Sequence, residues 1–141
     1  EAGERQVLLA LVCPTMLLGL VFLSLGVGVS SLVTRQVTAA SIAVVLWFLL
    51  VFFFDLAVLG LLVVSGGMVS GDVVSVLVFA NPAGLYRVEM MSYLMGSGAS
   101  EVFTEGLALP GAWVRGCIWV FWIVAPLGVG ARVLARLRSI R

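Results

Sequence analysis

The sequence predicts an all-α membrane protein, with three transmembrane helices and a short helical hairpin between the last two. Of its 141 residues, 62% are hydrophobic and 11% are charged, whereas a soluble domain is roughly 45–50% apolar and 25% charged. Three long apolar stretches are nearly free of charge, and glycine and proline break the segment before the third. This composition excludes a soluble enzyme, a disordered tail and a nucleic-acid binder, which needs a basic face.

The residue inventory predicts a non-catalytic chain with no resident cofactor or metal. The sequence has no histidine, and it contains no P-loop, GxSxG or HExxH motif. Its two cysteines, Cys13 and Cys117, lie far apart in apolar runs, where a cysteine usually packs as a small hydrophobic residue.

The first transmembrane helix is predicted over residues 7–33, a stretch that lies between Arg5 and Arg35 and has no charged residue. A spanning helix needs about 20 apolar residues, so this stretch is long enough. Residues 1–6 have no initiator methionine and do not form a signal peptide. We therefore expect them to be the extracytoplasmic end of a truncated chain.

The second and third transmembrane helices are predicted over residues 42–64 and 112–134. A short polar linker, residues 34–41, precedes the second helix, which ends at Ser65 and two glycines. A basic tail, residues 135–141, follows the third.

The arginines predict the orientation of the chain. The linker carries Arg35 and the chain's end carries four arginines with no acid near them. With three spans these two regions lie on the same side, and the positive-inside rule makes that side cytoplasmic. The residues used for this prediction are Arg35, Arg132, Arg136, Arg138 and Arg141.

The extracytoplasmic segment, residues 65–111, is predicted to contain two short helices, near 72–80 and 82–95. Asp72 is expected to cap the first, which is too short to span a bilayer and suits a re-entrant or interfacial helix. Asn81 and Pro82 are favoured at the start of a helix, so they predict the second. We expect that helix to stop at Gly96.

An acidic residue inside the second span suggests a polar site. Asp55 lies about ten residues, or about 15 Å, below the outer end of its helix, and a helix over 72–80 descends about 12 Å. An intramembrane charge normally faces a partner. We therefore expect Asp55 to meet the hairpin, and the candidate residues are Asn81, Pro82, Tyr86 and Arg87, with Arg115 on the third span as the other cation.

Three roles for Asp55 remain open at this point. It locks the hairpin in place, it lies in a substrate path or gate, or it is protonated and only tolerated. Met91 and Met95 raise a separate question, because they share a helix face and thioethers suit Cu(I). Methionine is also a common apolar filler, so copper contacts at these two residues are the less favoured interpretation.

The order of these features resembles the carboxyl-terminal half of an ABC-2-type transporter permease. The resemblance covers residues 34–141 and rests on VLWFLLVFFFDLAVLGLLVVSGG, on NPAGLYRV and on the arginine-rich end. It is strongest over residues 47–64 and at Asn81, Pro82, Tyr86 and Arg87. Within this superfamily it is greatest to the permeases of the nitrous-oxide reductase maturation system.

This resemblance implies the second half of a six-helix permease in a prokaryotic inner membrane. Such permeases work with a second permease copy and with cytoplasmic ATPase subunits that hold ATP and Mg. In this system the resemblance further implies a periplasmic partner and a role in copper-site assembly. Two other functions stay open: a structural or assembly subunit of another membrane complex, and a fragment of a channel or secondary transporter, in which Asp55 would be a pore feature.

Overall fold

The computed structural model describes residues 2–103 and 110–138, and within these ranges every regular element is a helix. The elements are α1 (Ala2–Leu32), α2 (Gln36–Phe48), the π-helical segment η1 (Leu49–Phe53), α3 (Phe54–Val64), α4 (Gly71–Ala80), α5 (Pro82–Phe103) and α6 (Ala112–Arg138). The predicted all-α class is confirmed.

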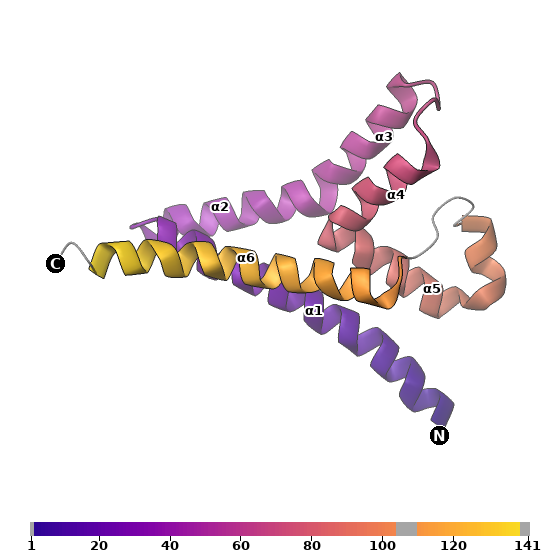
Figure 1. The fold of residues 1–141 in the computed structure, drawn as a ribbon, viewed down its shortest axis with the longest axis horizontal. Coiled ribbons are helices and arrows are strands. Elements are labelled where there is room, and N and C mark those ends of the chain that lie inside the picture. Colours follow the sequence, from indigo (N-terminus) through magenta and orange to yellow (C-terminus); the bar gives the residue numbers. More distant parts are fainter. Residues whose placement is uncertain (1, 104–109, 139–141) are drawn as a thin grey trace.

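The helices converge at one end of the molecule and splay at the other (Figure 1). Near the carboxyl terminus, α6 lies beside α1, and the turn from α1 to α2 is at the same end. From there α2, η1 and α3 run outward as one continuous helix that diverges from the other two. Helix α4 returns along α3, and α5 leads outward again.

Three helical stretches are long and apolar enough to cross a membrane: Val7–Leu32, Gln36–Val64 and Ala112–Arg136. They contain most of the residues in the three predicted spans. The second begins six residues earlier than predicted, so most of the predicted linker 34–41 is helical. Residues 34–41 contain no glycine or proline, and Ala39 is buried, which favours helix from Gln36 onward.

The hairpin elements also differ in detail from prediction. Helix α4 starts at Gly71 with Ser70 in the cap position, so Asp72 lies inside the first turn and makes no cap. A carboxylate there still interacts favourably with the helix dipole. Helix α5 continues past Gly96 to Phe103, because a glycine without a following proline costs an established helix only about 1 kcal/mol.

Two glycines shape the outer turn after α3. Gly66 and Gly67 have φ angles of 62° and 78°, in the left-handed region that other residues seldom adopt. They reverse the chain so that α4 can run back toward the bundle.

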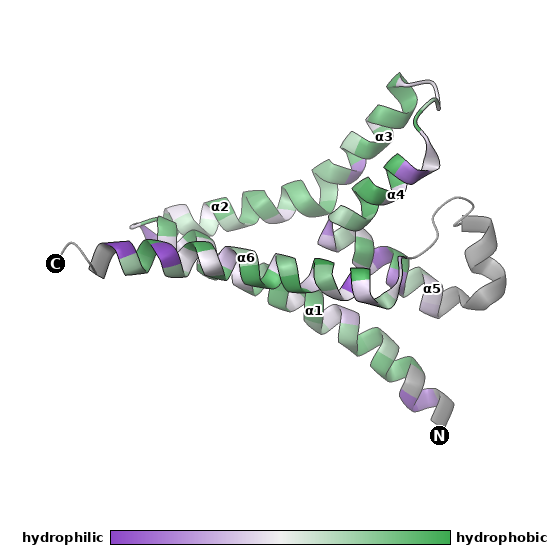
Figure 2. Cartoon of the chain, viewed as in Figure 1, coloured by the Kyte–Doolittle hydropathy of each residue, from purple (hydrophilic) through white to green (hydrophobic). Residues whose placement is uncertain are grey.

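A small core forms where α1, α4, α5 and α6 meet. Its buried members are Val21, Phe79, Leu85 and Trp119. Most large apolar side chains instead lie on the outer surface, and Figure 2 shows hydrophobic residues covering most of each long helix. Such a surface is stable in lipid, where apolar side chains need no covering.

Helices α1 and α6 pack closely near the ends that are predicted to lie on the cytoplasmic side. A β-carbon at Gly28 would lie 2.9 Å from the Pro126 carbonyl oxygen, and one at Gly130 would lie 2.8 Å from Ser31 Oγ. Small residues therefore permit the contact between these helices, as is common in membranes.

Candidate functional site

The π-helical segment η1 is the point at which the hairpin contacts the second span. In it the Phe54 N–H donates to the Leu49 carbonyl five residues earlier, which widens the helical turn. Two side chains from the hairpin donate to carbonyls of this turn: Asn81 Nδ2 to Leu50 O at 2.7 Å, and Arg87 Nη2 to Val51 O at 2.6 Å. The hairpin is thereby tied to the backbone of the span.

Arg87 also forms an ion pair with Asp55, through Nη1 and Oδ2. Both side chains are partly exposed. One guanidinium thus binds a carboxylate and a carbonyl one helical turn apart, and its planar fork of donors suits that task. The structure pairs Asp55 with Arg87, one of the candidates predicted from the sequence, which were Asn81, Pro82, Tyr86, Arg87 and Arg115.

Asn81 joins three elements at the bend between α4 and α5. Its Oδ1 accepts from the Ala83 N–H at 3.1 Å, as an N-cap does, while its Nδ2 reaches η1. Only 1% of Asn81 is exposed, and Pro82 beside it is fully buried. On the opposite side, Trp122 Nε1 donates to the Ala80 carbonyl at 2.8 Å. The bend is therefore held by η1 and by α6 together.

Tyr86 lies against α1 instead of Asp55. Its hydroxyl is 3.4 Å from Thr15 Oγ1, and either oxygen can donate. Through Tyr86, the first turns of α5 contact a third long helix.

Arg115 pairs with Glu89, at 3.2 Å between Nε and Oε1, and takes no part in the Asp55 contact. Glu89 was not among the site residues predicted from the sequence. A signal for it was present, because residues two apart on a helix face nearly opposite directions. If Arg87 faces α3, Glu89 faces away from α3 and can reach α6.

Glu89 is only 7% exposed. Burial raises the pKa of its carboxyl, while the Arg115 guanidinium and the Trp119 N–H favour the ionised form. That N–H lies near the carboxylate but makes no hydrogen bond of ordinary geometry, and it has no other partner in the described part of the chain.

Two pockets flank these polar groups. One, of about 490 Å³, lies between α1, α5 and α6 and is lined by Glu89, Arg115 and Trp119 among others. The other, of about 480 Å³, is lined in part by Arg87 and Met91. The side chain of Met95 is outside the described residues, so a shared copper contact with Met91 stays a prediction.

The arginines that predict the orientation gather at one end of the molecule. Arg35 directly precedes α2, and Arg132 and Arg136 are exposed near the end of α6 (Figures 1 and 2). Arg138 is the last residue of α6, but its side chain, like all of Arg141, lies outside the described residues.

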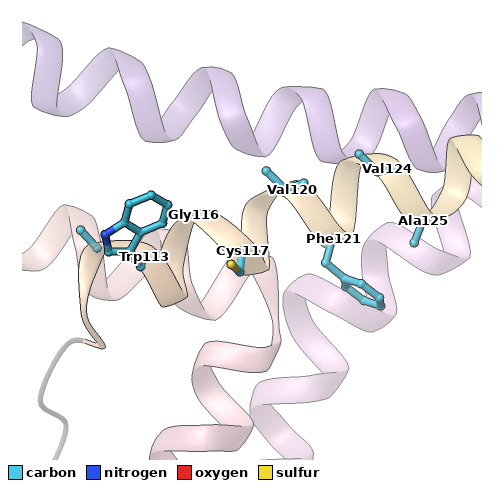
Figure 3. Close-up of a pocket in the computed structure, with 8 residues that line it drawn as sticks. Trp113, Gly116, Cys117, Val120, Phe121, Val124 and Ala125 are labelled. Atoms are coloured by element: carbon cyan, nitrogen blue, oxygen red, sulfur yellow. The ribbon is translucent and has the colours of Figure 1, made fainter.

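A third pocket, of about 760 Å³, is an apolar groove along α6. Figure 3 shows its side chains on the outer face of the helix, with Trp113 near the start and Val124 and Ala125 further along. Cys117 is exposed within it. No charged side chain lines this groove, unlike the pocket beside Glu89.

Together these contacts make a mechanical junction, in which charges and amides fix helices to one another. Comparison with known proteins shows the family of the chain. Residues 2–137 match the family model described as ABC-2 family transporter protein. The chain belongs to this family. An ABC-2 chain of this kind is a membrane subunit, and its three apolar helices fit that class.

Two curated relatives are similar to this ABC-2 chain, and each is named probable ABC transporter permease protein NosY. The one from Pseudomonas aeruginosa is 36% identical over 109 residues, which are 74% of this chain and 40% of the relative. The one from Stutzerimonas stutzeri is 40% identical over 95 residues, which are 67% of this chain and 34% of the relative. The chain thus spans two fifths or less of their length.

Proposed function

We propose that the chain forms part of the permease of an ABC transporter and transmits ATP-driven conformational change across the inner membrane. The observation that carries this proposal is the junction at η1. Asn81 and Arg87 attach the hairpin to the backbone of the second span, and Asp55 completes the attachment. A displacement of that span therefore moves the hairpin with it.

The structure of the junction favours a role in transmitting motion and not a role as part of a substrate path. Its donors are aimed at backbone carbonyls, where they fix the position of α5 relative to η1. Trp122 holds the same bend to α6. A push on any one of these helices is then shared with the other two through short, directed hydrogen bonds.

The family supports ATPase partner subunits, and we propose the more specific partners from the resemblance to the nitrous-oxide reductase maturation system. They are cytoplasmic ATPase subunits that hold ATP and Mg (NosF-like), a second permease copy, and a periplasmic NosD-like protein that contacts the hairpin end. The bilayer surrounds the assembly, and no nucleic acid takes part. The chain itself needs no cofactor for this role and performs no catalysis.

The names of the two relatives support a finer proposal, that the transmitted motion serves copper-site assembly of nitrous-oxide reductase. In this proposal the cytoplasmic side is the end that carries Arg35, Arg132 and Arg136. The hairpin of α4 and α5 then lies toward the periplasm.

The junction is tested by changing Asp55 in the intact protein, expressed with its partner subunits. Asp55→Asn and Asp55→Leu leave Arg87 without its carboxylate, which costs about 3–5 kcal/mol when the pair is buried and less at this partly exposed site. We expect ATP hydrolysis by the assembled complex to continue while the yield of copper-loaded nitrous-oxide reductase falls at least tenfold.

Two further variants make the result decisive. The exchange Asp55→Arg with Arg87→Asp keeps the pair and should recover part of the yield, and Asp72→Asn changes an exposed acid of α4 and should have no effect. If Asp55→Leu leaves assembly and yield intact, the junction does not transmit motion. If no ATPase associates with the intact protein, the permease assignment itself is wrong.

A further inference from the structure

The pocket between α1, α5 and α6 contains polar groups that the protein leaves without partners. Arg115 uses Nε for Glu89, and its two Nη groups have no partner among the described residues. The Trp119 N–H is in a side chain that is 4% exposed, and it makes no hydrogen bond of ordinary geometry with the described residues, although it lies near enough to the Glu89 carboxylate to favour its ionised form. Since a buried donor without an acceptor costs about 1–3 kcal/mol, a molecule that fills this pocket has a strong reason to bind.

The charges of the pocket balance. Glu89 carries one negative charge and Arg115 one positive charge, and no other charged residue lines the pocket. An anion alone would satisfy Arg115 and Trp119 but would lie beside the Glu89 carboxylate. A cation alone would leave both donors unpaired. A ligand with a negative and a positive group serves all three side chains without leaving a charge unpaired.

The position of the pocket in the molecule and its lining residues restrict the class of ligand further. Arg115 is in the first turn of α6, at the end of the molecule opposite the exposed arginines of the tail. Leu9 and Leu17 of α1 form an apolar wall, and Tyr93 lies at the α5 side. A charged rim beside an apolar wall near the end of a spanning helix matches the level of lipid head groups.

We propose that this pocket binds a phosphate group linked to a primary ammonium group, the chemistry of a phosphatidylethanolamine head. The phosphate oxygens accept from the Arg115 guanidinium and the Trp119 N–H, and the ammonium donates to the free oxygen of Glu89. The pocket volume of about 490 Å³ is within the range of small-ligand sites and is ample for this head group.

The test uses the intact protein, stripped of lipid in detergent and titrated in native mass spectrometry. The probes are palmitoyl-oleoyl phosphatidylethanolamine, the matching phosphatidylglycerol, and soluble glycerophosphoethanolamine. We expect the ethanolamine lipid to bind at least about tenfold more tightly than the glycerol lipid, because only it has an ammonium for Glu89. Binding of the soluble compound at similar affinity would identify a free zwitterion as the ligand, and binding of the lipid alone would identify the bilayer.

Three variants assign the contacts. Trp119→Phe removes the indole N–H together with the five-membered ring that carries it and leaves a six-membered aromatic ring, so it should weaken binding about fivefold. Glu89→Gln should abolish the preference for the ethanolamine lipid over the glycerol lipid. Trp113→Phe alters an exposed tryptophan on the same helix, outside this pocket, and should change nothing.

Equal binding of the two lipids by the unmodified protein would overturn the proposal. So would unchanged binding in Trp119→Phe, a result that would indicate water as the partner of the indole N–H. If Glu89→Gln does not fold, the comparison of Trp119→Phe with Trp113→Phe still tests the proposal, because both variants make the same change of side chain and keep the charges.

Discussion

Gly84 marks a close approach between α4 and α5, the two helices of the hairpin. A β-carbon at this position would lie 2.3 Å from the Val78 carbonyl oxygen, which is backbone and cannot rotate aside. The tight bend places Asn81 and Arg87 within reach of η1. The junction therefore requires glycine at position 84, because any larger side chain would clash with this carbonyl oxygen.

We expect Gly84→Ala to lower the free energy of unfolding by about 1–3 kcal/mol, because overpacking outweighs the better helix propensity of alanine. Gly60→Ala is the matched control, since no atom lies within 4 Å of a β-carbon there. That variant should be as stable as the parent or more stable. Thermal unfolding of the purified protein in detergent measures both, and equal midpoints for the two variants would contradict the close approach.

Glu89 gives the stability of the protein a pH dependence with a definite sign. Burial raises the pKa of its carboxyl above the ordinary value of 4.5. Between the ordinary and the raised value, the folded protein holds a proton that the unfolded chain has released, so the free energy of unfolding falls as pH rises. Above the raised pKa this dependence ends.

The variant Glu89→Gln removes the titrating group and should flatten the stability profile in that pH window. The measurement is the thermal midpoint of the intact protein and of the variant, from about pH 4 to pH 8. The unmodified protein should lose stability relative to the variant as pH rises. A difference that grows in the opposite direction would show that the Arg115 guanidinium outweighs burial.

Among the elements, η1 is defined by its partners as much as by its own residues. Its five residues, LLVFF, are ordinary for a lipid-facing helix. The donors that occupy two of its carbonyls come from Asn81 and Arg87, more than thirty residues later. A π-helical turn of this kind behaves like one extra residue in an α-helix and sets the direction of everything that follows it.

The widened turn of η1 already accommodates one extra residue, so a second residue inserted between Phe53 and Phe54 should rotate α3 by about 100° relative to α2. Asp55 then turns away from Arg87. Cysteines in place of Asp55 and Arg87, with Cys13 and Cys117 replaced by serine, should be joined by a short bifunctional thiol reagent in the parent and not in the insertion variant. Equal cross-linking in both would mean that the register of α3 does not set the position of Asp55.

The sequence predicted the features that depend on residues close together in the chain, and it missed those that depend on contacts between distant residues. Apolar length predicted the three spans, and Asn81 with Pro82 predicted the start of α5. The depth of Asp55 predicted contact with the hairpin, because a rise of 1.5 Å per residue is fixed for any helix. The π-helical turn depends on tertiary contacts, for which the local pattern carries no clear signal. The pairing of Glu89 with Arg115 follows from the spacing of Arg87 and Glu89 only once Arg87 is known to face α3.

At the scale of the whole molecule, the helices are held tightly at one end and loosely at the other. Gly28 and Gly130 permit close contact between α1 and α6 near the exposed arginines, while α1, α3 and α5 diverge at the far end (Figure 1). A molecule of this shape can change the spacing of its splayed end with little disturbance to its packed end.

The orientation in the membrane is tested by thiol labelling of the intact protein in cells, in a background without Cys13 and Cys117. Met68→Cys places a thiol in the turn after α3, where Met68 is 90% exposed, and Arg35→Cys places one before α2. A membrane-impermeant reagent added outside the inner membrane should label position 68 and not position 35. The reverse pattern would invert the topology and move the hairpin to the cytoplasmic side.

The pairing of Asp55 with Arg87 also has a consequence for the synthesis of the protein. The two residues are separated by 32 positions in the chain, so at about 5–20 residues per second the ribosome reaches Arg87 roughly 2–6 s after Asp55. During that interval α3 is in or near the insertion machinery with an acid that lacks its base. The amount of protein that matures in a cell should therefore depend on how fast the ribosome translates the codons between them.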